Sequence, residues 1–279
     1  KDFNKVLREI EGEIDIQFDK TGAHFEYSPS YSRFCLEGIQ VLLFFVDDIN
    51  IQGKLEMLAR KLSQYTYHGM IVEYGDFDDG SIFDYDQNFV FNNIFSDMFL
   101  HGCLYPLKLS EYSEAQSGIY GNLAYVKRHN HFATIRYGKT GLKGRASHDH
   151  DDVLSLRLFL SGKEILKEYG TPSYSFDAVL REKSLSSLSH NVIQIGKNDR
   201  FESVQGSVVK TVRGLQTANL KCCRDGFVEV EYDQVLSDRI LTINSSVELL
   251  KENIVVVDIL SDFEEITQCW HLNTTQEVA

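Results

Sequence analysis

The segment Ser147–Leu160 reads SHDHDDVLSLRLFL and joins a dense polar cluster to a strand-like run. Two histidines and three aspartates lie among its first six residues. The apolar run that follows ends at the turn pair Ser161-Gly162, which predicts a hairpin of strands over 153–160 and 164–168. Side chains two positions apart in an extended chain share one face, so we expect His148 and His150 to point the same way.

The rest of the chain after residue 102 continues this pattern of strands. Runs with period-two and β-branched residues are separated by turn signals, and no helical run lies between them. Such an order predicts antiparallel sheets packed as a sandwich rather than βαβ units. The further predicted strands are 118–127, 131–137, 190–196, 206–212, 226–232, 238–244, 253–260 and 266–272.

The chain before residue 102 has helical periodicity instead. Apolar residues recur at three- and four-residue steps from Phe3 to Ile14. Ser28-Pro29 is a helix start, because Ser caps free N–H groups and Pro suits the first helical position. The predicted helices are 3–16, 30–45, 52–67 and 88–100, and they make the first part all-α.

Composition excludes several classes of protein. The formal net charge of -13 over 279 residues argues against a nucleic-acid partner, since phosphate binding needs a basic surface. No apolar run reaches the ~20 residues of a membrane-spanning helix. The five cysteines include no CxxC pair, and we expect free or buried thiols. The chain starts with Lys and ends soon after a predicted strand, so we expect a fragment of a longer protein.

Three residues far apart in the chain form a plausible ligand set for zinc. A zinc ion needs three or four N, O or S ligands in fixed geometry. Glu168 ends the predicted hairpin and can return near His150, while His190 opens another predicted strand. The alternative is that each histidine only forms a hydrogen bond with a loop.

The order of motifs from Ala146 to Asn198 resembles the heparinase II/III-like polysaccharide lyases. The shared elements are His148-Asp-His150-Asp-Asp152, Ser161-Gly162, Glu168-Tyr-Gly170, Arg181 and the Ser-rich run that ends in His190-Asn191. Further likeness lies in Glu26-Tyr-Ser-Pro-Ser-Tyr31, Gly75–Gly80, Asp238-Arg239 and Val255–Asp258. The resemblance implies an α+β multidomain chain: part of an α/α toroid over 1–108, then an antiparallel β-sandwich over 109–279.

The same resemblance implies a chemistry and assigns residues to it. The family cleaves an acidic, uronate-containing glycan by β-elimination, with a tyrosine and a histidine transferring protons. In this sequence, Tyr31 matches that tyrosine and His148 matches that histidine. The resemblance also implies a structural or site-organising zinc on His150, Glu168 and His190, although the family more often has Asp where Glu168 stands. Asp152, Arg181 and Glu26 would support the site or contact substrate.

The resemblance also bears on activity and compartment. In the family, an Asn upstream of the tyrosine region neutralises the uronate carboxylate, and no residue before Tyr31 matches it. We therefore expect this chain alone to be inactive. The family is often periplasmic or secreted, whereas five cysteines without an evident pairing suit a reducing compartment, so a cytoplasmic location stays open.

Other interpretations remain open from the sequence. A non-catalytic protein that binds glycan or assembles envelope or capsular polysaccharide can keep the same fold. A glycosidase would depend on two carboxylates, with His148 dispensable. A cupin-type metal site would need a Glu soon after His148-Asp-His150, where the chain has Val-Leu-Ser-Leu.

Two local patterns also have two interpretations each. The acidic loop at Asp76, Asp78 and Asp79 is a turn or a calcium site, and the basic residues Lys127, Arg128, Arg136, Lys139, Lys143 and Arg145 form a glycan path or solvated strand edges.

Overall fold

A computed structural model gives the structure of the chain. It describes residues 3–68, 70–77, 117–139, 141, 148–172, 176–195, 201–203, 210–212, 218–235, 239–262 and 266–273. The predicted helix 88–100 and the predicted boundary between residues 108 and 109 lie outside these ranges. Asp78, Asp79, Lys143 and Arg145 lie outside them as well.

Three helices form the first part: α1 (Phe3–Gln17), α2 (Pro29–Phe45) and α3 (Ile49–Tyr65). These three predicted helices are confirmed, although α3 begins three residues earlier than expected. The Asp48 side chain accepts hydrogen bonds from the backbone N–H groups of Asn50 and Ile51 and so fixes that earlier start. In the part of the chain that the structure describes, no helix is long and apolar enough to cross a membrane.

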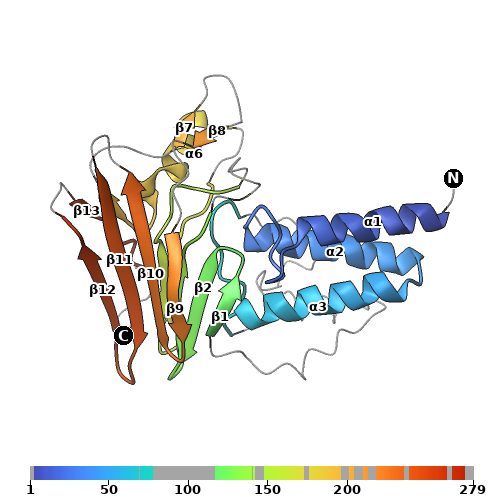
Figure 1. Cartoon of the computed structure of the whole chain (residues 1–279), viewed down its shortest axis with the longest axis horizontal. Helices are drawn as coiled ribbons and strands as arrows, with labels where there is room; N and C mark the ends of the chain where they lie inside the picture. Colours follow the sequence, from blue (N-terminus) through green and yellow to red (C-terminus); the bar gives the residue numbers. More distant parts are fainter. Residues whose placement is uncertain are drawn as a thin grey trace.

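Two antiparallel sheets form the second part (Figure 1). The first has the order β1-β2-β3-β4-β5 and the second the order β12-β11-β10-β9. The strands of the first are β1 (Ser117–Tyr120), β2 (Leu123–Arg128), β3 (His131–Arg136), β4 (Leu156–Leu160) and β5 (Lys163–Leu166). Those of the second are β9 (Ala218–Arg224), β10 (Phe227–Val235), β11 (Ile240–Leu249) and β12 (Ile254–Leu260).

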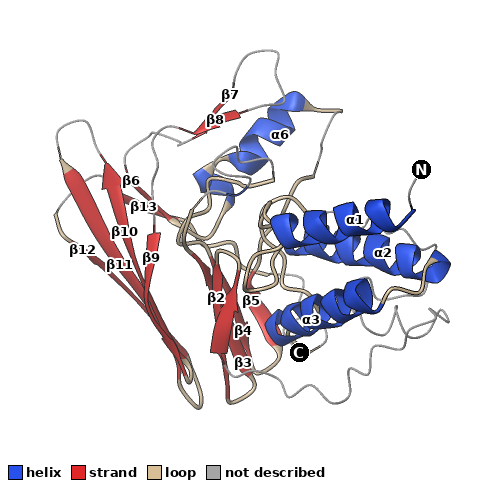
Figure 2. Cartoon of the chain, turned by 45° about the vertical axis from the view of Figure 1, so that its right-hand side comes forward, coloured by secondary structure: helices blue, strands red, loops and turns tan. Residues whose placement is uncertain are grey.

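Smaller elements complete the fold. Helix α6 (Ala178–Leu185) and the 3-10 turn η2 (Ser187–Ser189) that follows it lie beyond one end of the sheets, as Figure 2 shows for α6. Two short strand pairs are β6 (Ile193–Ile195) with β13 (Ile266–Gln268), and β7 (Phe201–Ser203) with β8 (Lys210–Val212). The prediction of helices followed by antiparallel strands is therefore confirmed. Strand β9 and helix α6 were not predicted.

One predicted strand is wrong. Residues 118–127 form two strands, β1 and β2, which pair as a hairpin around Gly121 and Asn122. Gly121 has φ +60°, which Gly adopts without the steric cost of a Cβ atom. The predicted strand 153–160 likewise begins only at Leu156, because Leu154 has φ +67° in a turn.

The inner strands of the five-stranded sheet, β2, β3 and β4, are buried on both faces, and the helices and the second sheet pack against them. Alternate residues such as Tyr125 and Phe132 pack into one core with the three helices. The intervening residues, such as Val126 and Ala133, pack into a second core with β10 and β11. Because strand side chains alternate between faces, one sheet joins the helical part to the second sheet.

Polar contacts also join the helices to this sheet. The Lys127 ammonium donates to the carbonyls of Gln64 and Thr66 at the end of α3, where the helix dipole favours a cation. The Tyr74 hydroxyl lies 3.0 Å from the carbonyl of Thr134 and 3.1 Å from that of Ser155. These bonds hold the segment after α3 on β3 and on the start of β4.

Replacing Tyr74 by Phe tests this attachment. Tyr74 is fully buried, so Tyr74→Phe leaves two buried carbonyls without that donor while keeping the ring. We expect the free energy of unfolding to fall by about 1–2 kcal/mol, measured by urea denaturation. The matched control is Tyr169→Phe, which removes an exposed hydroxyl and should change stability by less than about 0.5 kcal/mol. Equal effects of the two variants would contradict the assignment.

Candidate active site

A fully buried carboxylate, Asp76, lies at the centre of the site. Two predicted histidines contact it: His148 Nδ1 lies 3.1 Å from Oδ2, and His150 Nε2 lies 2.7 Å from Oδ1. Arg181 donates to both carboxylate oxygens, with Nη2 at 2.7 Å from Oδ2, and Thr171 donates through its hydroxyl. The carboxylate therefore connects the loop after α3, the histidine loop, the loop after β5 and helix α6.

The backbone around Asp76 explains how it enters the cluster. Its N–H donates to the carbonyl of His148 at 2.9 Å. Its own carbonyl accepts from the Ser28 hydroxyl at 2.7 Å. Gly75 has φ +65°, and a Cβ atom there would lie 2.4 Å from the His148 carbonyl oxygen. Only glycine fits this close approach without displacing the backbone.

Ser28 links this loop to the helix that carries Tyr31. Its hydroxyl oxygen accepts from the Tyr31 backbone N–H at 3.4 Å and so caps α2. The Tyr31 ring stacks on the imidazole of His148, with ring centroids 3.8 Å apart and planes at 22°. The structure thus brings together the two predicted acid/base residues, one from the helical part and one from the histidine loop.

Glu26 lies on the other side of the same imidazole. Its Oε2 is 3.3 Å from His148 Nε2, so His148 is held between two carboxylates. Burial raises the pKa of Glu26, and the charge of His148 acts in the opposite direction. For Asp76, burial raises the pKa, but hydrogen bonds from His148, His150 and Arg181 outweigh it and lower the pKa below its usual range. These hydrogen bonds therefore favour the ionised form of Asp76.

Arg136 anchors the loop that carries the two histidines. Its buried guanidinium donates to Asp149 and, at 2.8 Å, to Asp152. Burial raises the pKa of Asp152 to about 6, although the Arg136 charge lowers it. Arg136 and the buried Lys127 are thus committed to internal partners, and the interpretation of these two as part of a basic glycan path is wrong.

The three predicted zinc ligands lie close to one another beneath this loop. His190 Nδ1 is 2.6 Å from Glu168 Oε2, and the ring centroids of His150 and His190 are 5.1 Å apart. The other oxygen of Glu168 accepts from the Ser155 hydroxyl. Burial lowers the pKa of His190, but Glu168 outweighs it and raises the pKa above its ordinary value. For His150, burial dominates and lowers the pKa to about 4.

Two buried nitrogens in this cluster have no hydrogen-bond partner, namely His150 Nδ1 and His190 Nε2. Both are the ring nitrogens that face away from the carboxylates, and an imidazole lone pair there is a suitable metal ligand. Glu168 instead lies behind His190, with both oxygens already accepting hydrogen bonds. Within the described ranges, no group of three or more His, Cys, Asp or Glu side chains is arranged to hold a metal ion.

The sequence reasoning missed the central residue of the cluster. Asp76 was interpreted as part of a turn or calcium loop, whereas its partners lie 72, 74 and 105 residues further along the chain. The signal in the sequence that could have indicated Asp76 as a site residue is the resemblance of Gly75–Gly80 to the family. Thr171 was not singled out at all. Gly170 before it has φ +61°, and a Cβ there would overlap the ring of Phe77.

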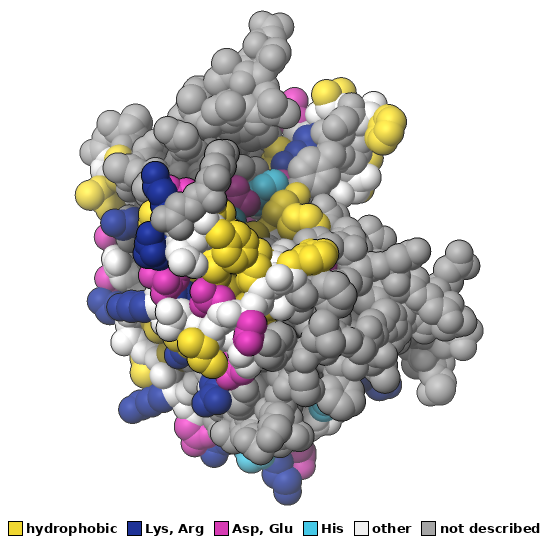
Figure 3. Space-filling model, turned by 90° about the vertical axis from the view of Figure 1, so that its right-hand side faces the viewer, with side chains coloured by type: hydrophobic (Ala, Val, Ile, Leu, Met, Phe, Trp, Pro, Cys, Tyr) yellow, Lys and Arg dark blue, Asp and Glu magenta, His cyan; other side chains and the backbone are white. Residues whose placement is uncertain are grey.

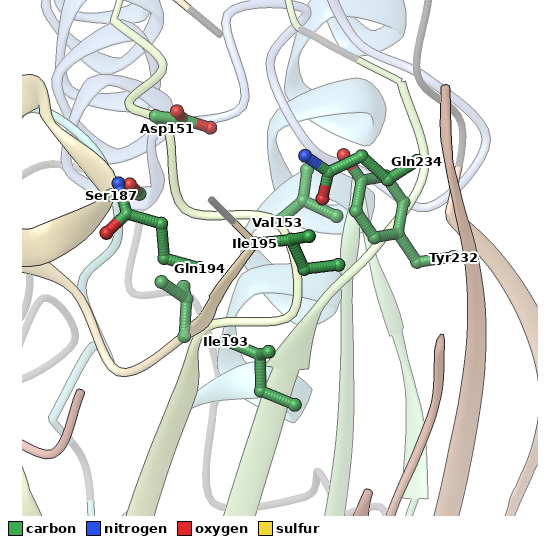
Figure 4. A pocket seen from close by; sticks show the side chains of 9 residues that line it. Asp151, Val153, Ser187, Ile193, Gln194, Ile195, Tyr232 and Gln234 are labelled. Carbon is green, nitrogen blue, oxygen red and sulfur yellow. The ribbon is translucent and has the colours of Figure 1, made fainter. Parts of the chain in front are cut away.

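A crevice lies next to the cluster, on the side of the second sheet. Figure 4 shows Asp151, Ser187 and Gln194 along one side of it and Tyr232 and Gln234 along the other. Gln194 is on β6, and Tyr232 and Gln234 are on β10. The lining mixes these polar side chains with the aliphatic residues Val153, Val192, Ile193 and Ile195, and Asp151 is the charged residue among them.

The outer end of the helical part has a different character. Phe3, Phe45 and Ile49 lie at this end and are each more than half exposed. Figure 3 faces this end of the molecule and shows hydrophobic side chains gathered beside acidic ones. The histidine and carboxylate cluster lies at the opposite end of these helices, against the sheets.

The fold and the cluster define a class of protein in which helices and antiparallel sheets share a buried His–carboxylate site. Residues 113–279 match the Heparinase II/III-like, C-terminal family, which is 167 of the 279 residues. The chain belongs to this family. No curated protein sequence matches it.

Solved structures with the same fold agree with this result. The heparinase III BT4657 gene product, in a form with methylated lysines, is 13% identical with a TM-score of 0.65, covering 91% of this chain and 40% of the other. The heparan sulfate lyase HepC from Pedobacter heparinus is 16% identical with a TM-score of 0.59, covering 89% and 40%. The chain therefore spans about two fifths of the length of these proteins, and the likeness shows the fold alone.

His24, which lies beside Glu26, gives the site a pH-dependent stability. Burial, followed by the charge of His148, lowers the pKa of His24 to about 4. The unfolded chain binds a proton near pH 6.5 that the folded chain does not bind, so stability falls as the pH drops from 6.5 to 4. Between these pH values, His24 should lower the free energy of unfolding of the wild type by on the order of 3 kcal/mol. We expect His24→Gln to lack this decrease when both proteins are measured by urea denaturation. His129→Gln, on an exposed turn, should leave the profile unchanged.

Proposed function

We propose that this chain carries the His–Tyr part of a polysaccharide lyase site that cleaves an acidic, uronate-containing glycan by β-elimination. The observation that supports this most directly is the stacking of Tyr31 on His148 where the helices meet the sheets. The family membership and the names of the structural neighbours, heparinase III and heparan sulfate lyase, favour the same class of reaction. In this proposal the helices are part of an α/α toroid and the two sheets are its β-sandwich.

The residue types fit the steps that a β-elimination requires. A base removes the proton on the carbon next to the uronate carboxylate, and the electron pair of that C–H bond forms a C=C double bond as the glycosidic C–O bond breaks. An acid returns a proton to the leaving oxygen. His148 and Tyr31 lie within one stacked pair, so one can act as base and the other as acid on the same face of a sugar. Glu26 beside His148 Nε2 would keep that nitrogen hydrogen-bonded until substrate binds.

The carboxylate of the substrate needs its own partner, since its negative charge opposes removal of the neighbouring proton. Arg181 is the cation of the cluster, but it is paired with Asp76. The resemblance instead gives this role to an Asn upstream of the tyrosine region. We therefore propose that turnover belongs to the intact protein and that its site of action is the periplasm or the exterior of the cell, where acidic polysaccharides occur.

We also propose that zinc binds beneath the histidine loop. The donor chemistry fits, because His150 Nδ1 and His190 Nε2 are buried nitrogens without a hydrogen-bond partner. Glu168 would orient His190 through its Nδ1, as carboxylates commonly do behind metal-bound histidines, or would turn to become a third ligand. When bound, zinc would supply a fixed positive charge that holds the loop in place.

Substitution of His148 and of Tyr31 tests the assignment of the acid/base pair. In the intact protein, His148→Ala and Tyr31→Phe should each lower kcat by about 10²–10⁴-fold, as expected for loss of a general acid or base. Turnover would be followed as the rise in ultraviolet absorbance of the unsaturated product on heparan sulfate, alginate and hyaluronan. His148→Ala also removes a partner of buried Asp76, so the melting temperature is measured beside kcat to separate lost catalysis from lost stability.

The controls separate this proposal from its alternative. Ser189→Ala removes an exposed hydroxyl that donates to the carbonyl of Lys183 and should leave kcat unchanged. If the intact protein binds one of these glycans but forms no unsaturated product, the protein is a non-catalytic glycan-binding member of the family. Full activity in His148→Ala would overturn the assignment of that residue.

The zinc proposal makes a separate prediction. His190→Ala should lose both bound zinc and stability, because ligand loss removes the free energy that binding contributes to folding. Zinc content would be measured by elemental analysis, and the melting temperature with and without a chelator. His131→Ala is the matched control, since His131 is equally buried but bonds to Ser161 and Lys251 away from the cluster. Equal zinc content in wild type and His190→Ala would contradict the assignment.

A further inference from the structure

Two histidines share the carboxylate of Asp76, and they face it with different ring nitrogens. His148 presents Nδ1 to Oδ2 at 3.1 Å, whereas His150 presents Nε2 to Oδ1 at 2.7 Å. The two residues are separated by one position in the chain. A single carboxylate therefore contacts two neighbouring imidazoles in opposite orientations.

Asp76 can only accept hydrogen bonds in this setting. An ionised carboxylate has no donor, so each nitrogen that faces it must carry a proton. Arg181 occupies both oxygens as well, and a guanidinium pairs with the ionised form of a carboxylate. His148 must then be protonated at Nδ1, and His150 must be protonated at Nε2.

We propose that Asp76 is the positioning residue of the site and fixes these two histidines in opposite tautomers. In the neutral form, the lone pair of His148 is then on Nε2, 3.3 Å from Glu26 Oε2. Glu26 is a partner for that lone pair only in its protonated form, which has an O–H to donate. The lone pair of His150 is on Nδ1, the buried nitrogen without a partner. One carboxylate thus directs one imidazole toward proton transfer and the other toward the buried cluster.

The surroundings of Asp76 suit a positioning role rather than contact with substrate. Asp76 is fully buried, whereas the side chain of His148 is 16% exposed. The Ser28 hydroxyl donates to the carbonyl of Asp76, and the N–H of Asp76 donates to the carbonyl of His148, so the main chain is fixed. Arg181 and Thr171 donate to the carboxylate itself. The carboxylate therefore has little freedom to turn, and its fixed position orients the two imidazole rings that donate to it.

The test reads the tautomers directly and does not depend on activity. The 279-residue chain would be labelled with ¹⁵N-histidine, and long-range ¹H–¹⁵N spectra would show which ring nitrogens carry protons. In the wild type we expect protonated Nδ1 in His148 and protonated Nε2 in His150. A proton only on Nε2 of His148, or only on Nδ1 of His150, overturns the proposal.

The variant Asp76→Asn tests the cause. The two rings face different oxygens of Asp76, and an amide presents its oxygen to one ring and its NH₂ donor group to the other. At least one histidine must therefore change tautomer. Asp152→Asn is the matched control, because Asp152 is a buried carboxylate bonded to Arg136 and contacts neither ring. Unchanged tautomers in Asp76→Asn would overturn the proposal, as would the same change in Asp152→Asn. If Asp76→Asn does not fold, the wild-type spectrum decides alone.

The functional consequence rests on the proposed lyase activity and is measured separately. In the intact protein, Asp76→Asn should lower kcat by about 10–100-fold with KM changed less than about twofold, as for loss of a residue that orients a catalytic group. An equal rise in KM with kcat unchanged would overturn a positioning role. A wild type without eliminase activity would contradict the proposed function, while the tautomer measurement would still test the role of Asp76.

Discussion

The structure depends on one buried charge. Moving an isolated carboxylate out of water costs several kcal/mol, and the cost is offset only when hydrogen-bond donors and opposite charges surround it. For Asp76 these donors come from the histidine loop, from Thr171 after β5 and from Arg181 on α6. The carboxylate is stable only when these segments are folded around it, so the site assembles as a unit rather than residue by residue.

The same requirement couples the site to the packing of the whole chain. The segment that carries Asp76 follows α3 and is held on the first sheet by Tyr74. The inner strands of that sheet are buried on both faces, against the helices on one side and the second sheet on the other. A change in how the helices pack on the sheet would therefore move Asp76 relative to His148. This geometry gives a physical reason for the helical and sheet parts to be joined in one rigid structure around the site.

Local pattern predicted the fold wherever one pattern dominated a segment. The helices over 3–17, 29–45 and 49–65 have clear apolar periodicity and caps, and the structure has them with small shifts. The prediction merged β1 and β2 because only the two-residue turn Gly121-Asn122 separates them, and both strands contain β-branched or aromatic residues. In β9 the adjacent pair Cys222-Cys223 interrupts the period-two pattern, which weakens its strand signal. Helix α6 is only eight residues long, and its apolar residues Val179 and Leu180 are exposed rather than on one buried face, so its periodicity is weak as well.

The site was less predictable than the fold, because its central contacts join residues 72 to 105 positions apart. Spacing within a strand suggested one shared direction for His148 and His150, yet residues 148–155 form a loop rather than a strand. In that loop both rings contact the carboxylate of Asp76, His148 through Nδ1 and His150 through Nε2. Sequence could suggest that a histidine pair matters, but not which nitrogen of each ring is left available. That choice depends on where Asp76 lies. Asp76 is placed by Gly75 beside it and by two partners far along the chain, Ser28 and the His148 carbonyl. The chemistry of the two histidines is therefore a property of the tertiary structure, set by a residue that does not itself reach solvent.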